Sequence, residues 1–330
     1  MTSLAPTLQA FFADRLVKQR RASPFTVEAY RDAFRLLLAF IYDHNGKSPS
    51  ELGIDDLDAT IIGSFLEHLE HGRGNCARTR NARLAALHSF FRFAAFRHPE
   101  HAALIQRVLA IPPKRYNRAL VTFLMRPEVD ALLTAPDRST WIGRRDHALL
   151  VLAVQTGLRV SEMARLVCQD VHLDAGAHVR CHGKGRKERI TPLTAQSVAI
   201  LRAWMKERRG QPGDPLFPTS RGQPLTTDAI AFLIGKYTAL AKHACPSLRA
   251  KQVSPHVLRH TCAMQLLQAG VDTSVIALWL GHEQIQTTQI YLHADLSLKE
   301  RALARTTPSS VESPGQYRPA DRLLAFLESL

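Results

Sequence analysis

Four short segments in the second half of the sequence carry side chains that can do chemistry. They are TGLRVSE (156–162), HGKGRKER (182–189), HVLRH (256–260) and LGHEQIQTTQIYLH (280–293). The candidate catalytic residues in them are, in chain order, Arg159, Lys184, His256, Arg259, His282 and Tyr291. Glu162 and His260 lie in the same segments and are candidates for supporting this set. Each residue taken singly has an ordinary structural explanation, but together they have a common chemical use.

That use is the cleavage of a phosphodiester without a metal ion. A phosphoryl transition state spreads negative charge over its non-bridging oxygens, and two arginines can hold those oxygens through bidentate, permanently charged forks. A tyrosine hydroxyl can attack the phosphorus and conserve the bond energy in a phosphotyrosine link, so no ATP is required. A lysine on a hairpin can protonate the departing oxygen, and histidines can exchange protons near neutral pH. We therefore expect no cofactor and no metal.

The pair His256 and His260, four residues apart, raises the alternative of a zinc site. The segment lacks the general-base glutamate of an HExxH motif, and the neighbouring Arg259 would repel a cation. The five cysteines are scattered and form no CxxC pair, which indicates free thiols in a reducing compartment. Zinc is therefore disfavoured.

The elements that must position these residues are predicted to be mostly helical. Helices are expected in RPEVDALLTA (126–135), in RRDHALLVLAVQTG ending at Gly157, at about 194–209, 226–243 and 256–269, and in TSVIALWLGH (273–282). HVRCHG and ERITPL are predicted to be two short strands around a basic tip, which places Lys184 on a hairpin. His256 and Arg259, three residues apart, then share one face of a helix.

The first third is predicted to be a separate helical domain. Residues 25–42 repeat apolar positions at helical spacing after Ser23 as N-cap and Pro24 in the first turn, and a second helix starts after Asp55 and stops near Gly72. A third helix, within residues 75–96, carries a basic face, and two prolines in IPPKRYNR (111–118) predict a linker. The predicted organisation is a helical domain over 1–110, a linker over 111–122, a catalytic domain over 123–305, and a flexible tail with a C-terminal amphipathic helix over 306–330.

The charge balance predicts a polyanionic partner. Of the 330 residues, 43 are Lys or Arg and 29 are Asp or Glu, giving a net charge of +14, and such an excess favours nucleic acid. The candidate DNA-binding residues are Arg78, Arg80, Arg83, Lys114, Arg115, Arg186 and Lys187. No apolar run is long enough to span a membrane and no signal peptide is recognisable, so we expect a cytoplasmic, DNA-associated protein.

The ordered motifs resemble those of the tyrosine recombinases, or phage integrase family. TGLRVSE, GKGRKER, HVLRH, LGH and IYLH match this family in type, order and separation over most of residues 123–295. The resemblance implies a mainly α fold with a small β-sheet or hairpin, in which a SAM-like core-binding domain precedes a mixed α+β catalytic domain. It also implies a simple two-domain recombinase of a bacterium, acting on double-stranded DNA near the nucleoid.

The resemblance further implies a role for each residue. Tyr291 would attack the phosphate to leave a 3′-phosphotyrosyl protein, with His256 as its proton acceptor. Arg159, Arg259 and His282 would bind the phosphate, and Lys184 would protonate the leaving oxygen. Glu162 would orient Arg159, and His260 would support the site. A homotetramer on DNA would form, with each C-terminal helix docked on a neighbouring subunit and a companion recombinase as a further possible partner.

Two other functions remain open at this stage. A type IB topoisomerase uses the same phosphotyrosyl chemistry, although the helical first third and the C-terminal helix argue against it. A DNA-binding regulator could keep the fold and lose catalysis, but every expected active-site position holds its usual residue type. Integration, excision, transposition and the resolution of dimeric replicons are all compatible with the sequence.

Overall fold

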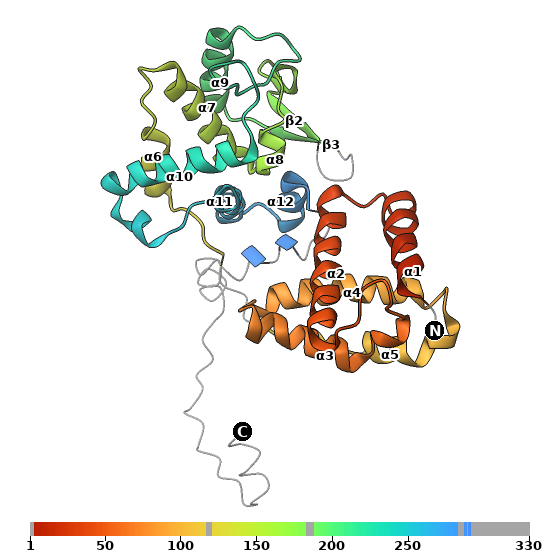
Figure 1. Cartoon of the computed structure of the whole chain (residues 1–330). Helices are drawn as coiled ribbons and strands as arrows, with labels where there is room; N and C mark the ends of the chain where they lie inside the picture. The colour runs from red at the N-terminus through yellow and green to blue at the C-terminus, as the bar shows by residue number, and fades with distance from the viewer. Residues whose placement is uncertain (1–2, 117–120, 183–187, 283–286, 289, 292–330) are drawn as a thin grey trace, which may run out of the picture. The chain divides into compact units, whose positions relative to one another are not determined.

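The computed structural model describes residues 3–116, 121–182, 188–282, 287–288 and 290–291 (Figure 1). The chain divides into two compact units, residues 1–118 and 119–330. The described residues are mainly helical, with one three-stranded antiparallel sheet, so the predicted fold class is confirmed. Among these residues, no helix is both long and apolar enough to cross a membrane.

The first unit is a bundle of helices around an aromatic core. Its elements are α1 (Leu4–Ala10), η1 (Phe11–Gln19), α2 (Pro24–Asn45), η2 (Ile54–Asp56), α3 (Ala59–Glu67), η3 (His68–Gly72), α4 (Ala77–Ala94), η4 (Pro99–His101) and α5 (Ala102–Leu109). Phe11, Phe34 and Phe90 pack edge to face in the core, with ring centroids 5.2–6.3 Å apart. Helix α2 begins as predicted, because the Ser23 side chain accepts a hydrogen bond from the backbone N–H of Thr26.

The second unit combines helices with one small sheet. Its elements are α6 (Arg126–Thr134), α7 (Trp141–Thr156), α8 (Val160–Met163), η5 (Cys168–Asp170), β1 (Val171–His172), β2 (His178–His182), β3 (Glu188–Pro192), α9 (Ala195–Arg208), α10 (Thr227–Ala244), η7 (Pro246–Ala250), α11 (Pro255–Gln268) and α12 (Thr273–Leu280). The strands run in the order β1-β2-β3, and Cys181 of β2 pairs with Arg189 of β3. The two predicted strands are therefore confirmed, and β1 is an addition that the sequence did not indicate.

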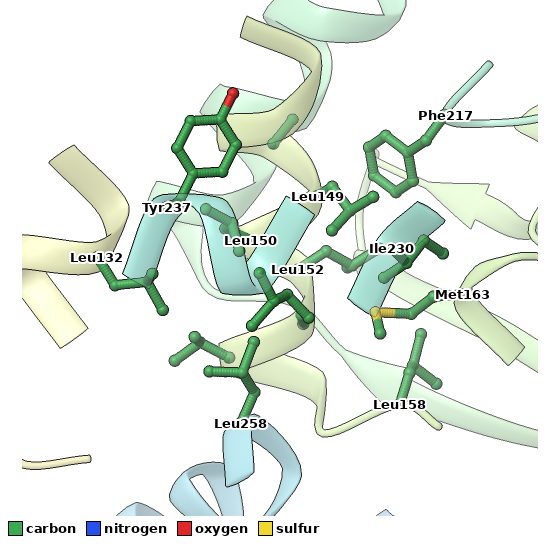
Figure 2. Close-up of a cluster of buried hydrophobic side chains, with 14 of the residues drawn as sticks. Leu132, Leu149, Leu150, Leu152, Leu158, Met163, Phe217, Ile230, Tyr237 and Leu258 are labelled. Atoms are coloured by element: carbon green, nitrogen blue, oxygen red, sulfur yellow. The ribbon is translucent and has the colours of Figure 1, made fainter. Parts of the chain in front are cut away.

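Helix α7 is the central helix of the second unit. It packs against α6, α9 and α11. Figure 2 shows its residues Leu149, Leu150 and Leu152 among apolar side chains of the neighbouring helices, and all three are buried. The Tyr237 hydroxyl of α10 donates to the Asp146 carboxylate of α7 at 2.7 Å, which satisfies both buried groups. The C-terminal end of α7 is thus a rigid base for the residues that follow it.

The structure corrects the interpretation of Arg80 as a DNA contact. Arg80 is 7% exposed, and its Nη1 donates to the carbonyl oxygen of Pro112 at 3.1 Å. It shares the buried face of α4 with Leu84 and Leu87, at helical spacings of four and seven residues. The basic stretch of this helix therefore splits between two faces, with Arg78 exposed and Arg80 turned inward.

The start of the predicted linker is attached to α4. The Asn81 side chain donates to the carbonyl oxygen of Lys114 and accepts from its backbone N–H, at 2.8 and 3.0 Å. The Lys114 ammonium also pairs with Glu70 at 2.6 Å. Residues 112–114 therefore belong structurally to the first unit.

Candidate active site

Arg259 is held from behind by two backbone carbonyl groups. The residue lies on α11 and is 4% exposed. Its Nη1 donates to the carbonyl oxygen of Gly157 at 2.7 Å, and its Nη2 donates to that of Leu280 at 2.6 Å. Burial, with the nearby charges of Arg159 and Arg189, lowers the pKa of Arg259 to about 10, which still leaves it charged at neutral pH. Because its hydrogen-bond partners among the described residues are neutral carbonyls, this buried cation keeps its charge available for an anion.

Gly157 permits this arrangement because no other residue fits at its position. Its φ is +61°, and it ends α7 in the left-handed conformation. A Cβ there would lie 2.7 Å from Leu280 Cδ2 and 3.1 Å from Cys262 Cβ. Because Gly157 has no side chain, the end of α7 packs closely against α11 and α12. This close packing places the Gly157 and Leu280 carbonyls where Arg259 can donate to both.

Replacement of Gly157 by alanine is expected to lower the free energy of unfolding by about 2–4 kcal/mol, because backbone strain and overpacking add. Gly176→Ala is the matched control: its φ is +74° and no atom lies within 4 Å of an added Cβ, so only the strain of about 1 kcal/mol is expected. Urea denaturation of both variants measures the difference. Equal losses would contradict the steric role of Gly157.

Glu162 is the carboxylate that aligns two arginines. Its side chain is 3% exposed. Oε1 accepts from Arg159 Nη1 at 3.0 Å and from Arg189 Nη1 at 2.9 Å, and Oε2 accepts from Arg189 Nη2 at 2.7 Å. Burial opposes its ionisation, but the Arg189 hydrogen bonds and charge outweigh this effect, and the pKa of Glu162 falls below its ordinary value. The Arg159 Nη2 also donates to the Gly281 carbonyl oxygen at 3.0 Å, so the Arg159 guanidinium is fixed at both ends.

Arg189 is a site residue that the sequence interpretation did not assign. Arg189 lies on β3 and connects it to two helices. Its Nε donates to the Trp279 carbonyl oxygen of α12 at 3.1 Å, and its guanidinium donates to the Glu162 carboxylate of α8. Strand alternation does not predict this role, because it would turn the apolar Ile190 towards the core. In the structure Ile190 is 61% exposed and Thr191 is buried, so Arg189 and Thr191 share the inward face of β3.

Tyr291 is buried at 1% exposed and packs with Leu280 and Cys262. Its hydroxyl lies 3.0 Å from Nδ1 of His260, and the two rings meet edge to face at 5.6 Å. Burial raises the pKa of Tyr291 to about 12 and, with the charges of His256 and Arg259, lowers the pKa of His260 to about 4. The imidazole is therefore uncharged at neutral pH, and its Nδ1 can accept the tyrosine proton.

His282 is a second histidine in contact with Tyr291. It follows α12, which ends at Gly281 with a φ of +64°, and this confirms its predicted place at a helix end. Its Nδ1 lies 2.7 Å from the Thr288 hydroxyl, and its ring stacks on Tyr291 with a centroid separation of 6.4 Å. Burial and the charges of Arg259, Arg159 and Arg189 lower the pKa of His282 to about 4.

The predicted site residues of the second unit thus fall into three groups. Arg159, Glu162, Arg259, His260, His282 and Tyr291 are brought together. His256 is exposed and stacks on His260 at 6.4 Å, and among the described residues it forms no hydrogen bond with Tyr291. Lys184, Arg186 and Lys187 lie outside the described residues. The described part of the chain contains no cluster of three or more His, Cys, Asp or Glu side chains able to hold a metal.

Acidification is expected to destabilise the fold through His260 and His282. An unfolded histidine titrates near pH 6.5, so between pH 6.5 and 4 the unfolded chain binds more protons than the folded protein. Stability is therefore lost as the pH falls through this window. The urea midpoint of the natural protein should decline between pH 7 and pH 5, which is above the pH range in which most carboxylates titrate. It should decline less for the double variant His260→Gln/His282→Gln. An unchanged slope would contradict the assignment.

Comparisons with known proteins now identify the family. The family model for the phage integrase family matches residues 122–297, and the model for the phage integrase N-terminal SAM-like domain matches residues 9–98. The chain belongs to the phage integrase family. The family, the fold class and the enzyme class predicted from sequence, a site-specific DNA recombinase, are thereby confirmed.

Individual relatives of this integrase-family chain agree. It is 56% identical to the putative integrase/recombinase y4rC of Sinorhizobium fredii over 99% of this chain and 98% of the relative. It is 32% identical to the tyrosine recombinase XerD of Pseudomonas putida over 86% of this chain and 91% of the relative. In structure it is similar to the Tn1549 transposon integrase in complex with circular intermediate DNA, with a TM-score of 0.68, 17% identity and coverage of 92% of this chain and all of that one.

Proposed function

We propose that this recombinase cuts and rejoins double-stranded DNA through Tyr291. The hydroxyl attacks a phosphate, a 3′-phosphotyrosyl bond forms, and a free 5′-hydroxyl leaves; the reverse attack by another 5′-hydroxyl reseals the strand. The observation that supports this best is the convergence of Tyr291, His260 and His282, which are joined by a hydrogen bond and ring contacts, with the Arg259 charge acting on Tyr291.

In this proposal the two arginines bind the phosphate. Arg259 uses one N–H on each of two nitrogens for the carbonyls of Gly157 and Leu280, and its other N–H groups remain for non-bridging oxygens. Glu162 sets the orientation of Arg159 from one side and Gly281 from the other. Lys184 protonates the leaving oxygen, and His282 donates to the phosphate.

His260 takes the hydroxyl proton in our proposal. The sequence had suggested His256 for this step, but the His260 ring is the one that lies on the Tyr291 hydroxyl. His256 is exposed and stacks on His260, and we propose that it passes the proton on to solvent. Because Tyr291 is 1% exposed, its side chain has to become accessible before it can reach a DNA phosphate. Binding of DNA is the event that we propose exposes it.

We also propose the larger assembly. Residues 1–110 bind one face of the DNA and residues 123–305 carry catalysis, joined by the linker 111–122. Arg78 and Arg115 are exposed in the first unit and contact phosphates, with Arg83, Lys114, Arg186 and Lys187 as further contacts. Four subunits assemble on two DNA sites. Each C-terminal helix (within 306–330) docks on a neighbouring subunit. In some complexes a companion recombinase takes the place of some of the identical subunits.

The biological setting that we propose is a mobile element in the bacterial cytoplasm, close to the nucleoid. The relative y4rC is named a putative integrase/recombinase, and the chain shares its fold with a transposon integrase, so movement of an element is the first candidate task. The similarity to XerD supports resolution of dimeric replicons as the second candidate task.

A nicked duplex tests the chemistry. Cleavage near the nick releases a short strand that cannot return, so the protein should accumulate as a covalent adduct without divalent ions or ATP. A two-site recombination assay run beside a plasmid relaxation assay separates recombinase from topoisomerase. Relaxation by isolated monomers without recombination would contradict the proposed function.

A further inference from the structure

A cavity of about 650 Å³ lies in the first unit, and none of the candidate active-site residues lines it. It opens between the end of η1 and the C-terminal half of α4. Its lining includes four arginines and two phenylalanines: Arg15, Arg20, Arg92, Arg97, Phe93 and Phe96. No acidic side chain lines it in the described structure.

The four arginines differ from other basic residues of the same unit. Lys18 pairs with Asp14, Arg31 with Glu28, and Lys114 with Glu70. Among the described residues, none of the four cavity arginines has a carboxylate within ion-pair distance; Arg15 donates instead to the Gln19 amide oxygen, and Arg97 lies over the Phe93 ring at 4.9 Å. Their charge is therefore not neutralised within the unit.

A simpler explanation is that these arginines offset the negative ends of two helices. The C-terminal end of a helix carries roughly half a negative charge. The ends of η1 and α4 together then offset about one of the four arginine charges, and about three positive charges remain without compensation. The Phe96 ring adds an apolar surface at the rim that is 91% exposed, which helix capping does not explain.

We propose that this cavity binds a strand of nucleic acid, with the arginine forks on its phosphates and the Phe96 ring against a sugar or base. Guanidinium groups beside an exposed ring are the combination that grips a backbone and stacks a base. Arg92 lies fourteen residues after Arg78 on α4, about 21 Å along the helix axis. The cavity is therefore separate from the phosphate contact that we propose for Arg78 near the N-terminal end of α4. The strand can belong to duplex DNA flanking the cut site or to a single strand. The choice of nucleic acid over an acidic protein rests on the proposed function.

Salt titration of binding tests the proposal with the full-length protein. A labelled duplex of arbitrary sequence and one of its separated strands are the two probes. Loss of two phosphate contacts in Arg92→Ala/Arg97→Ala should reduce the slope of log K against log salt by about 1.8 on the duplex or about 1.4 on the single strand. The probe that shows the loss identifies the source of the strand. Phe96→Ala should weaken binding of that same probe by about tenfold.

Controls keep the result interpretable. Arg107→Ala removes an exposed arginine of α5 outside the cavity and should retain the natural slope. Arg92→Lys/Arg97→Lys keeps the charge and should restore most of the slope, which also guards against loss of folding in the alanine pair. If the alanine pair matches Arg107→Ala on both probes, the proposal is overturned; altered self-association without DNA would then indicate an acidic protein surface. The adduct assay on a nicked duplex tests the proposed function independently, because binding at the cavity requires no cleavage.

Discussion

Tyr291→Phe is expected to abolish covalent capture of DNA and to reduce strand cleavage by at least about 10⁴-fold, because no other group replaces a lost nucleophile. The phenylalanine ring keeps the packing against Leu280 and Cys262 and the stacking on His282. Among the described residues, the hydrogen bond to His260 is the one that is lost, at a cost of about 1 kcal/mol in stability. A denaturing gel with a labelled nicked duplex measures the adduct.

Tyr237→Phe provides the matched control for this experiment. Tyr237 is also buried, at 3% exposed, and its hydroxyl is also hydrogen-bonded, but to Asp146 in the core of the second unit. It should lose stability and retain the adduct. The Tyr291→Phe variant should still bind DNA. An adduct that persists in Tyr291→Phe would show that another residue is the nucleophile.

Arg259→Lys is expected to slow cleavage by about 10³-fold while keeping a positive charge in the site. A lysine ammonium cannot span the carbonyls of Gly157 and Leu280 and still present a planar fork to the phosphate. The loss should therefore appear in the rate of the chemical step under single-turnover conditions, with DNA affinity changed far less. The measurement is the adduct rate at saturating protein.

The control for the arginine replacement is Arg249→Lys. Arg249 is exposed on η7, outside the site, and its replacement should leave the adduct rate unchanged. An Arg259→Lys variant that cleaves within about threefold of the natural rate would mean that charge alone is sufficient. The two-carbonyl support of Arg259 would then have no catalytic role.

Local signals made the candidate residues and most helix boundaries predictable. Ser23 before Pro24 marks the start of α2, and Gly157 after an apolar periodic segment marks the end of α7, because capping depends on neighbouring residues only. The hairpin follows from two short strand patterns around a glycine-containing tip. The residue types of the site were then sufficient to indicate phosphoryl transfer.

Partners that come from distant parts of the chain could not be read in the same way. The fork between Arg189 and Glu162 joins β3 to α8. Which histidine meets Tyr291 depends on how α11 lies against the segment that contains Tyr291. His256 and His260 stand one helical turn apart and are equivalent in sequence terms. Arg78 and Arg80 likewise differ only in which side of α4 faces the core.

The most direct test of the central claim is to identify the amino acid joined to DNA. The protein is trapped on a nicked duplex, digested with protease and nuclease, and the nucleotide-bearing peptide is sequenced by mass spectrometry. We predict a single modified residue, Tyr291, carrying a 3′-linked nucleotide through its phenolic oxygen. A nucleotide on any of the other five tyrosines of the chain, or a link through the 5′ phosphate, would contradict this claim.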